Sequence, residues 1–251
     1  MKISIITVSY NSENYIASAI ESVLSQTYSD IEYIIIDGGS KDNTVNIIKK
    51  FEPEFNGRMR WISEKDNGLY DAMNKGIRLA TGDVIGLINS DDLFCDNLAI
   101  EKVMTIFNSN QQLDSIYADL YYVAQNDTDK IVRRWVTGKQ RPFTYGWHPA
   151  HPTFYIKKVV YEKFGFFNLD FKLAADFEIM LRFLDKHNIS TLYLPEPLVK
   201  MRLGGETNKS LKNIYRQNIE CVKAFTVNQL QVNQFLYPFY RTIPKLLQFK
   251  K

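Results

Sequence analysis

The chain has 251 residues, 45% of them hydrophobic and 24% charged, with a formal net charge of +3 at pH 7, so it can bury the core of one domain with a small appendage. Its two cysteines, Cys95 and Cys221, are too few for a disulfide framework and match no metal-ligand spacing, which favours a reducing compartment. The sequence starts without a signal-peptide layout and has no apolar run near the roughly 20 residues that span a bilayer, so we expect a cytoplasmic protein, at most peripheral to a membrane.

In the first half of the chain, predicted strands and helices alternate. Short apolar runs predict strands at residues 3–7, 31–36, 60–62 and 84–88. Apolar residues at helical spacing predict helices after Ser12, after Asp42 or Asn43, and over residues 69–80. Such alternation predicts a mainly parallel sheet with right-handed crossovers. No glycine-rich dinucleotide motif follows the first strand and no Walker loop occurs, which argues against a dinucleotide oxidoreductase and a P-loop NTPase.

The second half is less regular. A helix is predicted to start at Asp96 or Asn97, and further helices are predicted at 157–164, 177–186 and 211–225. Strands are predicted at 115–123, 131–135 and 191–194. Residues 141–153 form a loop rich in proline, histidine and aromatic residues, and this change in composition indicates a second functional region.

Polar side chains follow three of the predicted strands. The run Asn89-Ser90-Asp91-Asp92 comes directly after strand 84–88, Asp37-Gly38-Gly39-Ser40 follows strand 31–36, and strand 3–7 leads into Ser9-Tyr10-Asn11. Ligands of open α/β sheets bind beyond the carboxyl ends of the strands, so we expect these segments to meet at one edge. Carboxylates at such an edge can hold a hard divalent cation against a diphosphate.

Together with the segment 64–76, these strand ends resemble the family 2 glycosyltransferases, specifically over residues 3–92 and more loosely to about Gly205. The resemblance implies the α/β GT-A fold, a Rossmann-like, mainly parallel sheet flanked by helices. It implies a catalytic domain at 1–206, in which 1–95 bind the nucleotide-sugar and 96–206 form the acceptor side. The implied reaction is inverting transfer from a nucleotide-sugar to a glycan or lipid-linked acceptor in cell-surface polysaccharide or lipid-linked glycan assembly. The resemblance implies that Asp37 contacts the nucleotide base or the sugar next to it, and a carboxylate that accepts an imide N–H favours a UDP-sugar.

The resemblance also assigns the donor site. The implied nucleotide-sugar-binding residues are Thr7, Ser9, Tyr10, Asn11, Asp37, Lys65, Asp66, Asn67, Gly68, Asp71, Asn74, Asn89, Ser90, Asp91 and Arg202. Asp91 is in addition the implied ligand of Mg²⁺ or Mn²⁺. Asn89 stands where many relatives have Asp, and because it adds no negative charge, this departure weakens metal affinity more than nucleotide binding. The structural alternative for Asp91 and Asp37 is a turn or a helix cap.

The resemblance makes Asp176 the catalytic base, in the run Ala174-Ala175-Asp176-Phe177-Glu178, where the family usually has Glu-Asp. Glu178 is the competing carboxylate, although its spacing predicts a charged helical face shared with Arg182. Asp176 is expected to precede this helix, and its structural alternative is an N-cap. His148 and His151 are expected to line the acceptor side, with a structural role as the alternative. Arg202 is expected to screen the leaving diphosphate from a glycine-hinged loop.

Residues 207–251 form a predicted helical extension that is basic and aromatic. After Glu206 there are eight basic residues and one acidic residue, Glu220, so this segment carries +7 and the remainder of the chain −4. Such a segment could dock on an anionic membrane, on its own domain or on a second copy of the chain. No nucleic-acid partner is expected.

Two other functions remain open from the sequence. A sugar-phosphate nucleotidylyltransferase also uses a nucleotide-binding α/β sheet, but its glycine-rich basic N-terminal loop is absent here. A non-catalytic protein of the same fold, acting through its basic aromatic extension, is consistent with Asn89 and Ala175, the two departures from the family pattern.

Overall fold

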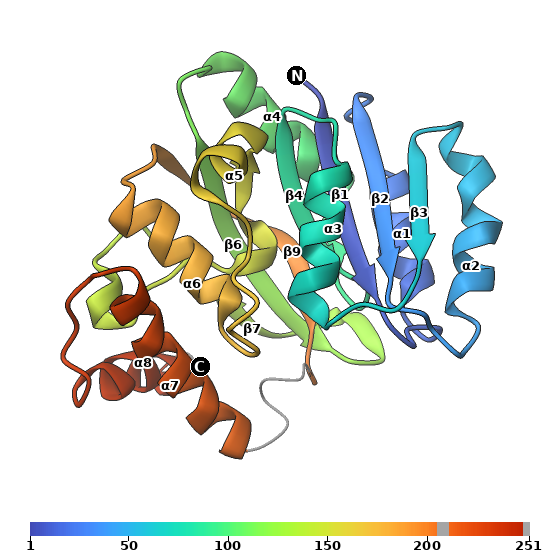
Figure 1. The fold of residues 1–251 in the computed structure, drawn as a ribbon. Coiled ribbons are helices and arrows are strands. Elements are labelled where there is room, and N and C mark those ends of the chain that lie inside the picture. The colour runs from blue at the N-terminus through green and yellow to red at the C-terminus, as the bar shows by residue number, and fades with distance from the viewer. Residues whose placement is uncertain (205–210, 248–251) are drawn as a thin grey trace.

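The computed structural model of the chain describes residues 1–204 and 211–247, and the side chains of these residues except Leu211 and 243–247. Within these residues, one nine-stranded sheet has helices packed on both faces (Figure 1). Its strand order is β3-β2-β1-β4-β8-β6-β9-β5, and β7 pairs with β6. The sheet therefore joins both halves of the chain.

The first half forms the parallel part of the sheet, as predicted. Its strands are β1 (Ile3–Ser9), β2 (Ile31–Asp37), β3 (Met59–Ser63) and β4 (Val84–Asn89). Its helices are α1 (Ile16–Leu24), α2 (Thr44–Phe51) and α3 (Leu69–Leu79). Every residue of β1 and β2 is buried, which explains why these strands appear in the sequence as continuous apolar runs.

Two apolar cores lie on opposite faces of this sheet. Side chains alternate along a strand, so Ile6 and Val8 of β1 join one core and Ile3 and Ile5 the other. The first core includes the apolar residues of α3, α5 (Lys158–Phe164) and α6 (Ala175–Leu181). The second includes those of α1 and α4 (Ala99–Ser109).

The second half adds antiparallel strands. Strand β8 (Tyr155–Lys157) pairs antiparallel with both β4 and β6 (Ser115–Ala124), and β6 also pairs antiparallel with β7 (Asp127–Trp135). Strand β9 (Thr191–Arg202) runs parallel to β6 and antiparallel to the short β5 (Leu93–Phe94).

Strand β9 is longer than predicted because the sequence signal stops at its prolines. The pairing of β9 with β6 shifts register after Leu194 and resumes at Pro197. The prolines therefore lie at an irregularity of the sheet, where their missing N–H groups cost no ladder hydrogen bond. The strand then continues to Arg202 and brings this residue to the edge formed by β4.

Helix α6 begins at Ala175, two residues before the predicted start at residue 177, and continues as a π-helical turn, Arg182–Lys186. Asp176 therefore lies in the first turn of the helix, and the prediction that it precedes the helix is wrong.

Helices α7 (Leu211–Val227) and α8 (Tyr237–Leu247) pack against the side of the domain that carries α6 (Figure 1). Cys221, Ala224, Phe225 and Tyr237 are completely buried in the first core. The predicted boundary between residues 206 and 207 lies outside the described residues. Among the described helices, none has the length and apolar character needed to cross a bilayer.

Candidate active site

The carboxyl ends of the four parallel strands form one edge of the sheet. The register places Ser9 beside Asp37, Val8 beside Asn89, and Asp37 beside Ser63. The predicted convergence of the first, second and fourth strands is confirmed, and β3 adds Ser63 to the same edge.

Asp37 organises the loop after β2. Its side chain is completely buried. Its carboxylate accepts hydrogen bonds from Ser9 Oγ (3.2 Å), Ser40 Oγ (2.5 Å), Gly39 N (3.1 Å), Ser40 N (2.9 Å) and Ser63 Oγ (2.6 Å). A nucleotide base could reach this carboxylate only if one of these donors left it, so the structure does not support the direct base contact predicted for Asp37. Asn11 fixes the same loop, because its Oδ1 accepts a hydrogen bond from Lys41 N at 2.8 Å.

Two further predicted binding residues direct their hydroxyl groups into the protein. Thr7 is completely buried, and its Oγ1 accepts a hydrogen bond from the Tyr33 hydroxyl at 3.0 Å. Ser90 is also buried, with its Oγ 2.8 Å from that of Ser12. These contacts give both residues a structural role at the edge.

Tyr10, Gly38 and Asp66 lie close together beside the edge. Tyr10 is 62% exposed. A Cβ atom on Gly38 would lie 2.7 Å from Asp66 Oδ2 and 3.5 Å from the Tyr10 ring, so any larger residue at position 38 would collide with Asp66. Asp66 Oδ1 accepts a hydrogen bond from Gly68 N at 2.8 Å. Because Asp66 is only partly buried and Asp37 is completely buried, Asp66 is the more accessible of the two carboxylates to a nucleotide base.

Side chains of α3 bind the segment between β3 and α3 through hydrogen bonds and an ion pair. Asp71 Oδ2 accepts hydrogen bonds from Asn67 N at 2.9 Å and from Asn67 Nδ2 at 3.4 Å. Lys75 Nζ forms an ion pair with Glu64 Oε1 at 2.7 Å, and this contact raises the pKa of the Lys75 ammonium. Lys65 is exposed on the loop between β3 and α3, where the predicted binding of a nucleotide-sugar is sterically possible.

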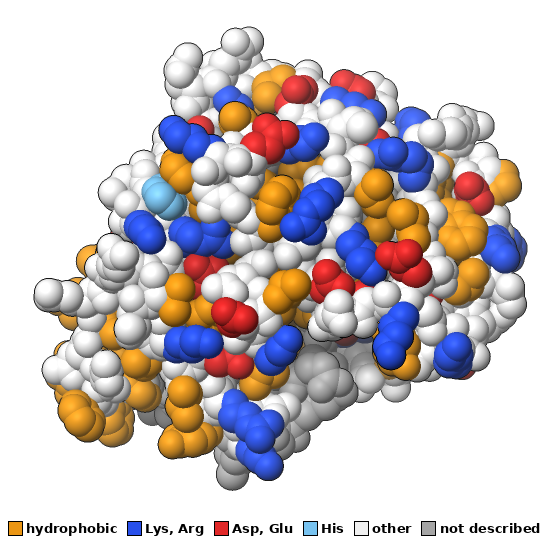
Figure 2. All heavy atoms as spheres, in the orientation of Figure 1, with side chains coloured by type: hydrophobic (Ala, Val, Ile, Leu, Met, Phe, Trp, Pro, Cys, Tyr) orange, Lys and Arg blue, Asp and Glu red, His pale blue; other side chains and the backbone are white. Residues whose placement is uncertain are grey.

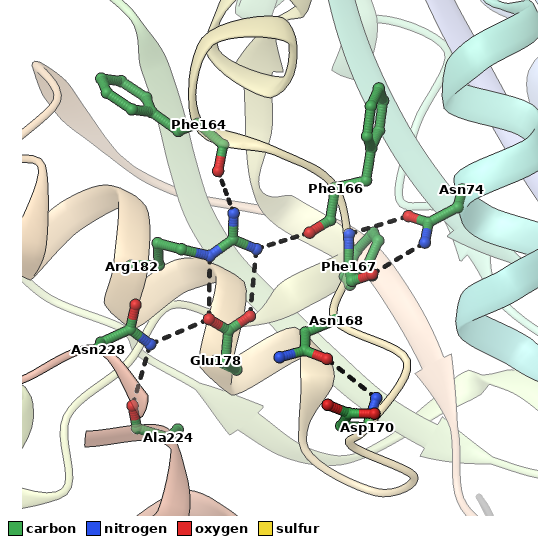
Figure 3. Close-up of polar contacts among 10 residues, drawn as sticks. All are labelled: Asn74, Phe164, Phe166, Phe167, Asn168, Asp170, Glu178, Arg182, Ala224 and Asn228. Carbon is green, nitrogen blue, oxygen red and sulfur yellow. Dashed lines mark hydrogen bonds and ion pairs between the residues drawn. The ribbon is translucent and has the colours of Figure 1, made fainter. Parts of the chain in front are cut away.

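Asn74 points away from the predicted donor site and into the protein. It is 2% exposed, and its side chain bonds both the N–H and the carbonyl of Phe167, each at 2.9 Å (Figure 3). The expectation that Asn74 faces the donor with Asp71 is therefore wrong. Its role is to fasten α3 to the segment before α6.

At the end of β4, Asn89 and Asp92 are joined by a hydrogen bond from Asn89 Nδ2 to Asp92 Oδ2 at 2.8 Å. Asp92 is 1% exposed and also accepts a hydrogen bond from Arg202 N at 3.3 Å. Burial, followed by the charge of Asp91, raises the pKa of the Asp92 carboxyl well above its usual range. Asp91 is half-buried. Of the two carboxylates, Asp91 and Asp92, it is therefore the one at the rim, the name used here for the solvent-facing end of β4.

Arg202 links the backbone at the rim to residues from two other parts of the chain. Its guanidinium donates to the carbonyl of Asp91 at 2.5 Å, to the carbonyl of Gln125 at 3.2 Å and to Ser18 Oγ at 3.1 Å, and it lies over the Tyr15 ring. In this arrangement Arg202 positions the backbone of Asp91. Gly205 and Glu206 of the predicted hinge lie outside the described residues.

Asp176 lies in the first turn of α6 and is linked to α3 by a hydrogen bond. The Tyr70 hydroxyl donates a hydrogen bond to Asp176 Oδ1 at 3.2 Å. Burial, and next the charge of Asp176, raise the pKa of the Tyr70 hydroxyl well above its usual range, so it stays protonated as a donor. Tyr70 was not predicted as a site residue, because in the sequence it fits the apolar face of α3.

Of the two predicted acceptor-side histidines, His151 lies near Asp176, and His148 packs against the next residue, Phe177. His151 Nε2 is buried and has no hydrogen-bond partner among the described residues. Burial lowers the pKa of His151, while the charge of Asp176 acts in the opposite direction, which places the two groups within electrostatic reach. The His148 ring packs edge-on against both Trp135 and Phe177, at 5.2 and 5.7 Å between ring centroids.

Glu178 pairs with Arg182, as its spacing predicts, but the ion pair is buried. Arg182 Nε and Nη2 donate to its two carboxylate oxygens at 2.9 and 3.2 Å, and Asn228 Nδ2 donates to Oε1 at 3.0 Å (Figure 3). The same guanidinium binds the carbonyls of Phe164 and Phe166. Because these donors occupy Glu178, the structure favours Asp176 as the reactive carboxylate.

Comparisons with known proteins agree with this arrangement. The model of the family described as glycosyl transferase family 2 matches residues 4–174. An uncharacterised glycosyltransferase of Mycobacterium tuberculosis is 32% identical over 187 residues, which cover 72% of this chain and 68% of that protein. A PGL/p-HBAD biosynthesis glycosyltransferase of Mycobacterium bovis is 25% identical over 198 residues, which cover 76% of this chain and 73% of the relative.

Solved structures show the same fold at lower identity. Residues 1–349 of Staphylococcus aureus TarS have a TM-score of 0.66 at 17% identity, over 96% of this chain and 69% of that one. The same TarS fragment has been solved with UDP and with UDP-GlcNAc. A mannosyltransferase of Pyrobaculum calidifontis in complex with GDP-Man and Mn²⁺ has a TM-score of 0.65 at 14% identity, over 95% of this chain and 68% of that one. The chain therefore has the GT-A fold and belongs to glycosyl transferase family 2.

Proposed function

We propose that this transferase moves a sugar from a UDP-sugar to an acceptor hydroxyl with inversion at the anomeric carbon. The observation that carries the proposal is the placement of Asp176. It lies in the first turn of α6, bonded to Tyr70 of the donor-side helix α3, while the competing Glu178 is buried in an ion pair. UDP is favoured by the TarS complexes and by Asp66, a partly exposed carboxylate beside the strand ends that could accept an imide N–H.

In the proposed reaction Asp176 takes the proton of the acceptor hydroxyl. The acceptor oxygen attacks the anomeric carbon from the face opposite the nucleotide and forms the new C–O bond. The bond between the anomeric carbon and the diphosphate breaks, and UDP leaves with the electron pair. One carboxylate suffices because the leaving group is already an anion, whereas glycoside hydrolysis needs a second carboxyl to protonate the leaving oxygen.

The residues at the end of β4 fit a divalent cation that is held mainly by substrate phosphates. No three His, Cys, Asp or Glu side chains gather into a metal site within residues 1–204 and 211–247, so the protein offers no complete cage there. Mg²⁺ typically binds proteins through one or two carboxylates together with substrate phosphates, and Asp91 at the rim meets this need. A bound Mg²⁺ or Mn²⁺ would stabilise the charge of the departing diphosphate. The mannosyltransferase complex with Mn²⁺ supports this part of the proposal.

UDP should stabilise the protein against heat, and more strongly with Mn²⁺ than without it, because ligands that bind only the native state raise the melting temperature. The measurement is a thermal-shift series with UDP, GDP, UDP-sugars and Mn²⁺, followed by product analysis with glycan and lipid-linked acceptors. Stabilisation by nucleoside triphosphate with a sugar phosphate would instead indicate a nucleotidylyltransferase. No response to any nucleotide would indicate a non-catalytic protein.

Asp91→Asn is the matched variant for this series. It should retain the fold and lose most of the Mn²⁺-dependent stabilisation by UDP, because the carboxylate lies at the rim and serves the ion. Asp30→Asn is the control, since Asp30 is exposed at the opposite end of the sheet, just before β2. Equal UDP affinity and an equal metal requirement in the Asp91→Asn and wild-type proteins would reject Asp91 as the ligand.

We further propose that the exposed aromatic residues before and within α8 contact an anionic membrane, near the acceptors of cell-surface glycan assembly. Phe235 and Phe239 are 87% and 63% exposed, and Leu236 and Tyr240 are exposed beside them. Figure 2 shows hydrophobic side chains gathered on the part of the surface where α7 and α8 lie in Figure 1. The extension 207–251 as a whole carries +7, and this positive charge favours anionic lipid.

The double substitution Phe235→Ser and Phe239→Ser should weaken binding to phosphatidylglycerol vesicles by about tenfold, because each exposed phenyl ring loses its burial in the lipid interface. Hydrolysis of UDP-sugar in solution should be unchanged. Point substitutions are preferable to truncation, since Tyr237 between these residues is buried in the core. If the substitutions instead convert a dimer to a monomer, this face binds a second copy of the chain.

A further inference from the structure

Helix α7 contributes one carboxylate to the segment that carries Asp176. Glu220 is the sole acidic residue after Glu206 in a segment that is otherwise basic. Its carboxylate accepts hydrogen bonds from the backbone N–H groups of Lys172 (3.0 Å), Leu173 (2.8 Å) and Ala174 (2.9 Å). Hydrogen bonds to a charged acceptor are about twice as strong as those between neutral groups.

These three N–H groups directly precede α6, and the residue at its N-cap position, Ala174, has no side chain that could cap the helix. Glu220 therefore binds, from another helix, the N–H of the N-cap residue and those of the two residues before it. Gln217, one turn earlier in α7, donates from Nε2 to the carbonyl of Leu173 at 3.2 Å. The backbone that leads into Asp176 is thus held through both its N–H groups and a carbonyl.

Two further contacts with α6 lie beyond Asp176. Asn228, the residue that follows α7, donates a hydrogen bond to Glu178, and the ring of Phe225 in α7 packs with its centroid 5.9 Å from that of Phe177. Helix α7 and Asn228 therefore contact residues that precede Asp176 in the sequence and residues that follow it. The charge of Glu220 also contributes to raising the pKa of Tyr70, which places it near the Tyr70 and Asp176 pair.

We propose that Glu220 is a positioning residue for the catalytic base, holding residues 172–174 so that the Asp176 carboxylate stays beside the Tyr70 hydroxyl and faces the acceptor. The inference rests on the proposed function, because it gives Asp176 the role of base. Glu220 and the whole of α7 lie beyond residues 4–174, the part of the chain that the family model matches.

Glu220→Ala should lower kcat for transfer by about 10- to 100-fold, because displacement of a catalytic group by about 1 Å costs up to about 10²-fold. The affinity for UDP and the KM for the donor should change by less than about twofold, since Glu220 acts on the acceptor side. Glu220→Gln should give an intermediate loss, because its amide oxygen still accepts hydrogen bonds but carries no charge. Arg216→Ala, at an exposed position one turn earlier in α7, is the control.

A double substitution separates positioning from general support of the fold. In the Asp176→Asn background, Glu220→Ala should cause no further loss of kcat, because its effect acts through the carboxylate that is already gone. An equal loss of kcat in both backgrounds would overturn the proposal, as would a fall in UDP affinity that accounts for the loss of activity. If Glu220→Ala does not fold at the assay temperature, Glu220→Gln decides, and an unchanged kcat in that enzyme overturns the proposal.

The same experiment distinguishes failure of the inference from failure of the proposed function. Wild-type turnover in Asp176→Asn would reject the base assignment, and with it the role given to Glu220. A large loss in Asp176→Asn together with wild-type turnover in both Glu220 variants would reject the role of Glu220 alone.

Discussion

Asp176→Asn should transfer sugar about 10²- to 10⁴-fold more slowly than the wild-type enzyme, the usual contribution of a general base. Its affinity for UDP and its melting temperature should stay close to wild type. Asparagine has the shape of aspartate, and its Oδ1 can still accept the hydrogen bond that Tyr70 donates at 3.2 Å. The measurement is transfer to acceptor, with donor binding determined separately by calorimetry.

Glu178→Gln is the comparison for this variant. Glutamine keeps the shape of Glu178 but removes the charge that pairs with Arg182, so the change should lower stability more than turnover per folded molecule. Near wild-type turnover in Asp176→Asn would show that the Asp176 carboxylate has no catalytic role and only stabilises the first turn of α6. Collapse of turnover in Glu178→Gln alone, with the fold intact, would assign the base to Glu178.

Arg182→Leu should lower the free energy of unfolding by about 3–5 kcal/mol, the usual cost of removing one partner from a buried ion pair. The substitution leaves the Glu178 carboxylate, whose side chain is 2% exposed, without its counter-ion. It also removes the donors to the carbonyls of Phe164 and Phe166 (Figure 3). Urea unfolding followed by circular dichroism gives the change in free energy.

Lys186→Leu is the control for Arg182→Leu, because Lys186 is exposed one turn further along the same helix. It should change the free energy of unfolding by less than about 0.5 kcal/mol, as surface substitutions usually do. A loss of less than about 1 kcal/mol in Arg182→Leu would contradict the buried pair, since that is the range of an exposed salt bridge.

The donor-side strands were predictable because their signals are local. A strand buried on both faces has a continuous apolar sequence, and the polar residues after β1, β2 and β4 mark the sheet edge at which ligands bind. The five donors to the Asp37 carboxylate were not predictable, because Ser9 and Ser63 reach it only once β1 and β3 have paired with β2.

The surroundings of the base were not predictable for a related reason. A polar stripe that contains Glu178 and Arg182 has the spacing of a solvated face, and its burial depends on Asn228, 50 residues away in the sequence. Tyr70 has the spacing of an apolar helix residue, and its hydroxyl has a partner only because Asp176, 106 residues further on, lies beside α3. Both misreadings arise from contacts between elements that are distant in the sequence.

The two sides of the site take their rigidity from separate stretches of the chain. All the donors to Asp37 come from residues 9–63, so the loop after β2 is held by its own neighbours. The turn that leads into Asp176 is held instead by α7, through Glu220 and Gln217. Under the proposed function, changes in α7 therefore alter the surroundings of the base and leave the hydrogen bonds of the Asp37 loop in place.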